Sequence, residues 1–308
     1  TFDNVIGLAG GQLVPGVVPD QLANASLRWE SSYQTNLGLD LGLFDDKINM
    51  EVNYYNIDTK DLLMPNYNTP VYLGYLTRFA LKNVGEINNK GLEIALSSTN
   101  IYTNNLQWTT NLNWSTNRTE IIKMNEGIDV YLDASPGYFS RERTHILREG
   151  EVPGAFWGYV YEGVYVGGQL PEGTAMLAGG TIGDPMFAEV ADEEGNYDGV
   201  IDTQDQQIIG DPTPDFTYGI NNTVTYKNFD LNVFIQGKQG GDVFNLTRVQ
   251  LMNGDANAIT DVLDAWSLEN PESNIPRVGN NSLRELSTRF VEDGSYIRLK
   301  NVSIGYRI

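Results

Sequence analysis

The 308-residue chain contains no cysteine and only one histidine, His145. The lack of cysteine excludes a disulfide framework, a zinc–thiolate site and a cysteine nucleophile. A single histidine makes a histidine-based catalytic or metal site improbable. Basic residues are also scarce, with 20 Lys and Arg against 40 Asp and Glu and a formal charge of −20. Because phosphate contacts need clustered Lys and Arg, we expect no nucleic-acid partner.

Long hydrophobic runs are missing as well. No apolar stretch reaches the roughly 18 residues that a membrane-spanning helix needs. The first residues, 1–8, lack the basic region and the apolar core of a signal peptide. Neither absence bears on transmembrane β-strands, which show only weak alternation over about ten residues.

Alternation of apolar and polar residues is the strongest pattern that is present. In 106–115, Leu106, Trp108, Leu112 and Trp114 occupy even positions, and every odd position is polar. Successive side chains of a strand point to opposite faces, so such a strand has one apolar and one polar face. The same pattern occurs in 37–43, 47–54, 92–97, 218–226, 229–236 and 296–306.

Three features favour a membrane barrel over a soluble sandwich. The alternating segments exceed the usual five or six residues of a strand, and aromatic residues lie near their ends. The connections also fall into two classes, as in outer-membrane barrels, whose turns are short on one rim and long on the other. The short ones are 44–47, 100–105 and 226–229, and the long ones are 58–88, 117–215 and 238–294. We therefore predict an all-β protein, a transmembrane antiparallel β-barrel with its apolar face toward lipid and its long loops outside the cell. The alternative is a secreted β-rich module that binds glycans or cells, with the apolar face turned inward.

Several motifs, taken in chain order, resemble the SusC/RagA group of TonB-dependent outer-membrane transporters. They are Trp29-Glu30 at the start of a strand, 54–63 (YYNIDTKDLL), 83–93 (NVGEINNKGLE), 195–205 (GNYDGVIDTQD), 209–219 (IGDPTPDFTYG) and 295–306 (SYIRLKNVSIGY). The resemblance covers nearly the whole chain.

The resemblance implies a fold and a function. Members of the group carry an N-terminal plug, a TonB-interaction segment and a plugged barrel of about 22 strands. Plug and TonB segment are not recognised here, so we expect 1–308 to be a partial barrel from the C-terminal half, contributing roughly nine or ten strands. The implied function is import of an oligosaccharide or peptide nutrient across the bacterial outer membrane. The implied partners are a SusD-like lipoprotein lid, TonB acting through the missing N-terminal region, and membrane lipid. No covalent chemistry is implied, so we do not expect an enzyme.

One segment, 194–205, has the spacing of an EF-hand calcium loop. Oxygen-bearing side chains occupy positions 1, 3, 5, 9 and 12, and glycine occupies position 6. The predicted ligands are Glu194, Asn196, Asp198, Asp202 and Asp205, with the backbone carbonyl of Val200. Glu at position 1 and Asp at position 12 depart from the usual pattern. The sequence predicts a structural Ca²⁺ site, and the alternative is an Asn/Asp/Gly turn that binds no ion.

The long loops are rich in aromatic residues and contain one helical pattern. Aromatic side chains there could stack on a sugar or grip a peptide, but we expect most to pack within the loops or against a partner. They are Tyr67, Tyr72, Tyr75, Tyr138, Phe139, Phe156, Trp157, Tyr159, Tyr161 and Tyr165. In 258–266 the apolar residues Ile259, Val262, Leu263 and Trp266 share one helical face, which predicts a short helix.

Overall fold

The computed structural model describes residues 2–9, 12–19, 24–66, 80–124, 127–133, 143–252, 257–278 and 285–308. Strands β1 (Phe2–Ala9) and β2 (Gln12–Pro19) pair as an antiparallel hairpin. Among the helices that these residues form, none is long and apolar enough to cross a membrane.

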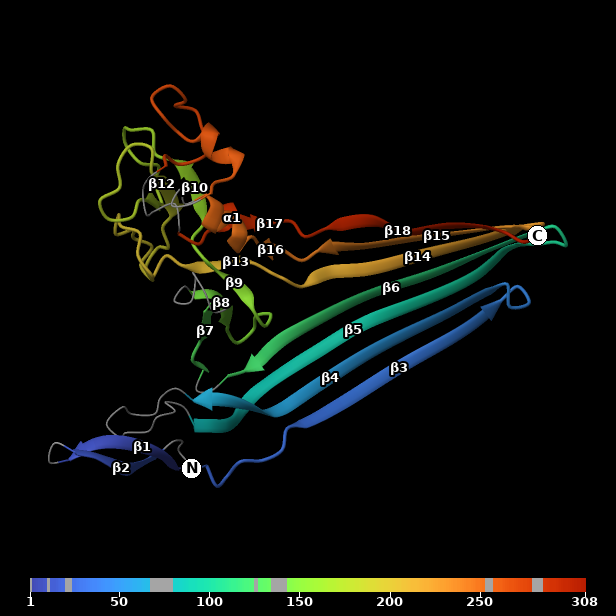
Figure 1. Cartoon of the computed structure of the whole chain (residues 1–308), viewed down its shortest axis with the longest axis horizontal. Coiled ribbons are helices and arrows are strands. Elements are labelled where there is room, and N and C mark those ends of the chain that lie inside the picture. The colour runs from blue at the N-terminus through green and yellow to red at the C-terminus, as the bar shows by residue number, and fades with distance from the viewer. Residues whose placement is uncertain are drawn as a thin grey trace.

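Seven long strands form one antiparallel sheet, the elongated part of the molecule in Figure 1. They are β3 (Ser31–Leu43), β4 (Ile48–Asn66), β5 (Ala80–Tyr102), β6 (Leu106–Lys123), β14 (Pro214–Tyr226), β15 (Phe229–Gly240) and β18 (Tyr296–Tyr306). Each strand pairs with the next of the series, so the sheet is an up-and-down meander. The all-β, antiparallel prediction is confirmed. Nine or ten strands were expected, and this sheet has seven: β1 and β2 form a separate N-terminal hairpin, and the other strands form small sheets in the loops.

The short turns all lie at one end of the sheet and the long connections at the other (Figure 1). The turn between β3 and β4 uses left-handed backbone at Phe44, Asp45 and Asp46, and the turn between β14 and β15 uses it at Lys227. Such tight turns fix the register of each hairpin. The two-class pattern of connections predicted this arrangement.

The long strands extend beyond the predicted loop boundaries. β4 continues to Asn66 and β5 begins at Ala80, so their connection is 67–79 and not 58–88. The other two long connections are 124–213 and 241–295 instead of 117–215 and 238–294. The loop boundaries were predicted at the positions where the alternation of apolar and polar residues ends. The backbone hydrogen bonds between strands continue beyond those positions. Polar side chains support them there, since Asn88 donates hydrogen bonds to Asn56 (2.8 Å) and Asp58 (2.8 Å) across the strands.

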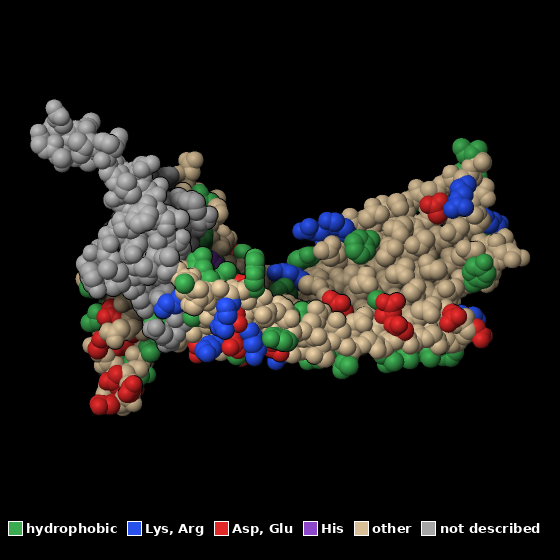
Figure 2. Space-filling view, turned by 90° about the horizontal axis from the view of Figure 1, so that it is seen from below, with side chains coloured by type: hydrophobic (Ala, Val, Ile, Leu, Met, Phe, Trp, Pro, Cys, Tyr) green, Lys and Arg blue, Asp and Glu red, His purple; other side chains and the backbone are tan. Residues whose placement is uncertain are grey.

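The strand register places apolar side chains of all seven strands on one face. One complete row across the sheet consists of Leu41, Met50, Leu96, Leu112, Ile220, Ile235 and Leu299. This face is not covered by protein: Leu299 is 61% exposed and Ile304 76% exposed. Figure 2 shows hydrophobic side chains projecting along the lower edge of the sheet. A secreted β-sandwich would bury this face against a second sheet, so the alternative of a secreted β-rich module does not fit. The apolar face is the surface that meets lipid.

The height of the apolar face matches a membrane. On β5 it runs from Leu92 to Ile101, about 30 Å along the strand at about 3.3 Å per residue. A strand tilt of about 40° reduces this to about 23 Å along the membrane normal, close to the apolar band of about 25 Å in outer-membrane barrels. The ring of Phe229 lies against that of Tyr306 at 4.7 Å near the short turns, where an aromatic girdle is expected.

The predicted helix at 258–266 is a shorter, tighter element. The structure has the 3₁₀-helix η3 (Thr260–Asp264) there. Three residues per turn do not keep the predicted residues on one face, so Ile259 packs into a core while Leu263 is 86% exposed.

Adjacent residues on β6 test the assignment of the two faces. Leu112→Arg in the full-length receptor should lower the free energy of unfolding from lipid vesicles by about 2–4 kcal/mol, because the charge enters hydrocarbon. Asn111→Arg is the matched control, since its side chain points to the polar face. Urea titration of the vesicle-inserted proteins measures both, and equal losses would contradict the assignment.

Candidate functional site: luminal wall and external loop unit

The face opposite the lipid is polar and forms the wall of the barrel lumen. One row of the register joins Asn53, Glu93, Ser115, Thr217, Lys238 and Tyr296. The next row toward the short turns joins Asp40, Glu51, Ala95, Asn113, Gly219, Gln236 and Arg298. Most of these side chains line one hollow of about 520 Å³. The wall therefore offers hydrogen-bond donors and acceptors to a polar molecule at neighbouring positions.

In these two rows, acidic and basic side chains lie on opposite sides of the wall. Asp40, Glu51 and Glu93 lie on β3, β4 and β5, whereas Lys238 and Arg298 lie on β15 and β18. Neutral polar residues separate them on β6 and β14. Neighbouring strands are about 4.8 Å apart, so Glu93 and Lys238, three strands apart, lie about 14 Å from each other.

A second hollow, of about 470 Å³, lies along β3, β4 and β5 and shares Asn53 and Glu93 with the first. Tyr55 lies across Gly91 here and donates a hydrogen bond to Asn117 (3.0 Å). A Cβ at position 91 would collide with the Tyr55 ring, so this position needs glycine. Asn89 lines the same hollow, and its Oδ1 has no hydrogen-bond partner among the described residues.

The two largest loops, 124–213 and 241–295, fold into one packed unit beyond the end of the sheet (Figure 1). The first contains a four-stranded sheet of β7 (Val130–Asp133), β8 (Arg143–Leu147), β9 (Ala155–Gly158) and β13 (Gln207–Gly210). It also contains a three-stranded sheet of β10 (Tyr161–Val164), β11 (Thr174–Ala175) and β12 (Pro185–Ala188). The second contributes β16 (Val243–Phe244), α1 (Leu246–Leu251), η3, η5 (Thr288–Phe290) and β17 (Val291–Glu292).

Backbone hydrogen bonds join the two loops around Tyr159. Its N–H donates to the Leu286 carbonyl (2.9 Å), and its carbonyl accepts from the Thr288 N–H (3.0 Å). The Tyr159 ring lies in a buried cluster with Ala175, Phe187 and Ile201. This short parallel bridge ties the first loop to the second as a strand pair would.

An ion pair forms a second junction between the loops. Arg277 Nε donates to Asp184 Oδ1 at 2.7 Å, and Asp184 is buried, with 1% of its surface exposed. The hydrogen bond to Asp184 raises the pKa of Arg277. Next to it, the Arg277 N–H donates to the Gly183 carbonyl (2.8 Å). Removing Arg277 would take a charged hydrogen-bond donor from the buried Asp184 carboxylate, which should cost more than losing a fully exposed ion pair.

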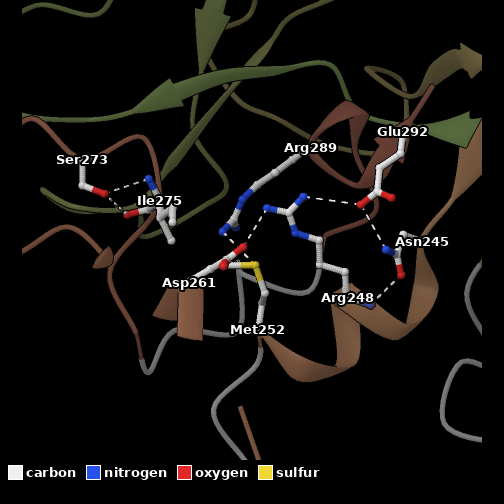
Figure 3. Close-up of polar contacts among 8 residues, drawn as sticks. All are labelled: Asn245, Arg248, Met252, Asp261, Ser273, Ile275, Arg289 and Glu292. Atoms are coloured by element: carbon white, nitrogen blue, oxygen red, sulfur yellow. Dashed lines mark hydrogen bonds and ion pairs between the residues drawn. The ribbon is translucent and has the colours of Figure 1, made fainter. Parts of the chain in front are cut away.

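A group of polar residues organises the second loop (Figure 3). Arg248 bridges Asp261 (3.1 Å) and Glu292 (3.5 Å), and Asn245 caps α1 through the Arg248 N–H. The guanidinium of Arg289 lies over the rings of Tyr161 and Phe290. Burial lowers the pKa of Arg289 to about 10.

The aromatic residues of the loops pack with protein, as expected for most of them. Phe156, Trp157 and Tyr159 are buried, and Trp157 Nε1 donates to Gln206 Oε1 (3.0 Å). Tyr161 donates through its hydroxyl to the Asn274 carbonyl (2.8 Å), another contact between the loops. Tyr67, Tyr72, Tyr75, Tyr138 and Phe139 lie outside the described residues.

Three of the residues predicted to bind calcium, Asp198, Asp202 and Asp205, accept hydrogen bonds from backbone N–H groups. Asp198 accepts from Val200 (2.8 Å) and Asp202 from Gln204 (2.7 Å), each two residues along the chain. Asp205 is buried and accepts from the Val190 and Asp202 N–H groups, both at 2.8 Å. Glu194, Asn196, Asp198, Val200 and Asp202 are exposed. Across the described part of the chain, no three acidic or histidine side chains are grouped in a way that could hold a metal ion. Calcium binding by this loop stays a prediction.

Sequence reasoning missed two carboxylates that organise this loop. Asp192 accepts from the N–H groups of Glu194 (2.9 Å) and Asn196 (2.8 Å), and the bonds from Asn196 lower its pKa. Glu189 accepts from the Gly199 N–H (2.7 Å). Gly195 and Gly199 both have positive φ, and the recurrence of Asp or Glu before such glycines is the sequence signal that could have identified these turns.

The exposed lipid face, the polar lumen and the loop unit at one rim define the class of the molecule: an outer-membrane β-barrel. Comparison of sequences matches residues 4–308 to the family described as TonB dependent receptor-like, beta-barrel. TonB-dependent receptor P3 of Formosa agariphila is 45% identical over 307 residues, covering 100% of this chain and 30% of that protein. TonB-dependent receptor SusC of Bacteroides thetaiotaomicron is 27% identical over 293 residues, covering 92% of this chain and 26% of that protein.

A solved structure shows the same fold. In the "Structure of the RagAB peptide transporter", one chain superposes with a TM-score of 0.76 at 23% identity, covering 99% of this chain and 32% of that one. The chain thus spans about a third of the length of its relatives. It belongs to the TonB-dependent receptor β-barrel family, whose members are outer-membrane receptors and transporters and not enzymes.

Two buried tyrosines predict how the loop unit responds to alkali. Burial raises the pKa of Tyr159 and of Tyr161 from 10.0 to about 12. Between these pH values the folded unit holds protons that the unfolded chain has released, so its stability should fall as pH rises from about 10 to 12. Ultraviolet absorbance of tyrosinate in the full-length receptor measures this. Tyr161→Phe should remove one late-titrating group, and titration of both residues near pH 10 would contradict the prediction.

The calcium prediction is checked by calorimetry on the full-length receptor. If the loop binds Ca²⁺, Asp198→Asn with Asp202→Asn should weaken binding by about tenfold or more, because two anionic ligands are lost. Asp45→Asn with Asp46→Asn, in the turn between β3 and β4, removes the same charge elsewhere. The absence of binding heat at millimolar Ca²⁺ in the unchanged receptor would refute the site.

Proposed function

We propose that this chain is the barrel part of an importer that carries a nutrient across the outer membrane. The main observation that supports this proposal is the polar luminal wall. Its hollow of about 520 Å³ lies on the inner face of a sheet whose outer face meets lipid. Membership of the TonB-dependent receptor family supports a transport function driven through TonB. The proposed energy-coupling segment belongs to the part of the relatives that this chain does not span.

The proposed substrate is an oligosaccharide or a peptide. Both present closely spaced hydrogen-bonding groups, which the amide, hydroxyl and carboxylate side chains of the two luminal rows can match. Similarity to SusC supports this general class, and the RagAB title names a peptide transporter.

The proposed external partner is a SusD-like lipoprotein that covers the loop unit. The two loops have cores of their own, with Val249, Met252, Leu286 and Phe290 in one cluster and Ile146, Val152, Ala155 and Trp157 in another. A unit that is packed internally can present a preformed surface to a partner, which lowers the ordering cost of binding. The similarity to SusC supports the choice of partner.

Uptake by whole cells tests the proposal. Cells that carry the full-length receptor with its lipoprotein should accumulate a fluorescent oligosaccharide or peptide only when TonB is intact. Glu93→Gln and Lys238→Gln should each lower uptake of the accepted substrate about tenfold, the effect of losing one charged hydrogen bond. Lys227→Gln, in a short turn, is the control for Lys238→Gln, because it removes the same charge away from the luminal wall. TonB-independent accumulation of both substrates would refute the proposal.

A further inference from the structure

A pair of basic residues lies on the outer face of the sheet, at the loop end of the apolar surface. Lys90 on β5 and Arg118 on β6 are directly opposite each other in the register. The row continues through Asn56 on β4 to Thr35 on β3. It is the next outward-facing row after the one that contains Tyr54, Leu92 and Thr116.

The side chains of this region confirm which way it faces. Strand alternation places Lys90 on the same face as Leu92 and Ile94, which belong to the lipid-facing surface. The hydrogen bonds from Asn88 to Asn56 and Asp58 connect residues of the same parity on β4 and β5. Tyr55 and Asn117, of the opposite parity, meet on the luminal side. Lys90 and Arg118 therefore point away from the lumen.

Their height along the strands corresponds to the lipid headgroups. The apolar surface ends with Leu92 on β5, and the rows beyond it are polar or charged. Between Leu92 and the short turns, the apolar surface is already about 23 Å tall along the membrane normal. The row of Lys90 and Arg118, beyond Leu92, therefore lies where the hydrocarbon ends and the lipid headgroups begin. Figure 2 shows charged side chains of both signs, Lys and Arg among Asp and Glu, near the loop end of the sheet, while hydrophobic side chains continue toward the short turns.

The electrostatics of the pair favour an anion between the two side chains. Directly opposite residues have Cβ atoms about 4.5–5.5 Å apart, and like charges in such positions destabilise a sheet. Both residues are exposed, and neither forms an ion pair with another described residue. The nearest carboxylates of the outer face, Asp58 and Glu120, lie one row farther from the membrane, and Asp58 already accepts hydrogen bonds from Asn88 and Asn56. Arg118 also borders a small hollow of about 150 Å³ with Glu120, Glu151 and Asp211, and it forms no ion pair with any of the three.

We propose that Lys90 and Arg118 form a binding site for the phosphate of a lipid headgroup in the external leaflet. The guanidinium of Arg118 presents a planar fork that matches two phosphate oxygens, and the ammonium of Lys90 supplies a point charge beside it. Tyr54 and Leu92, in the row below, contact the upper part of the lipid chains. The site holds the lipid against β5 and β6, the strands that lead into the first large loop.

The full-length receptor, purified in detergent and titrated with diphosphorylated lipid A, tests the site by native mass spectrometry. Lys90→Gln with Arg118→Gln should weaken binding roughly 30-fold, the combined effect of two basic residues at an anionic membrane surface. Lys47→Gln with Lys227→Gln removes two exposed charges at the opposite rim and should change binding less than about twofold. Lys90→Arg with Arg118→Lys keeps both charges and should retain most of the affinity.

Three outcomes would overturn the proposal. The first is unchanged lipid A binding in the Lys90→Gln, Arg118→Gln receptor, whose folding is checked by heat-modifiable migration on gels. If that receptor does not fold, the single variants Lys90→Gln and Arg118→Gln replace it, each with an expected loss of about fivefold. The second is equal binding of dephosphorylated lipid A, which would mean that phosphate is not recognised. The third is full displacement of lipid A by millimolar inorganic phosphate, which would identify a free-phosphate site instead of a lipid site.

Discussion

The hydrogen-bonding of the backbone in lipid is the constraint on which this structure depends. Hydrocarbon offers no partner to a peptide N–H or C=O, so every strand that crosses it must be paired on both sides by another strand. Five of the seven long strands, β4, β5, β6, β14 and β15, achieve this through one antiparallel ladder in which neighbours in space are neighbours in the series. β3 and β18 are the outer members of this sheet, and their free edges require strands from the remainder of the barrel.

Once the ladder is fixed, the alternation of side chains separates two environments. The row from Leu41 to Leu299 meets lipid, and the row from Asp40 to Arg298, one residue away on every strand, meets the lumen. Beyond the membrane, water relaxes the constraint on the backbone, and the chain there forms short sheets, a six-residue helix and 3₁₀ turns. Those elements have small apolar cores of their own and depend on specific junctions such as Asp184–Arg277.

The parts of the molecule that could be predicted from sequence are those governed by local periodicity. Alternation at 106–115 identified β6 and its two faces, and the short turns identified the rim. Strand ends were misplaced because ladder hydrogen bonds continue through polar residues such as Asn56 and Asn88. The ion pair between Asp184 and Arg277 spans 93 positions, and no local pattern contains it. In 194–205 the spacing of oxygens is that of a calcium loop, but the same spacing also suits Asx turns, in which Asp198 and Asp202 bind the backbone two residues ahead.

The joining of the two external loops has a consequence for how such receptors diversify. Loop 124–213 and loop 241–295 share a backbone bridge at Tyr159, the ion pair of Arg277 with the buried Asp184, and the contact of Tyr161 with Asn274. A change on one side of these junctions needs a matching change on the other. Exchange of a single loop between two receptors would separate residues that contact each other across the junctions, whereas exchange of both loops would preserve every junction. Recombination that alters specificity should therefore keep the segment from the end of β6 to the start of β18 as one inherited block.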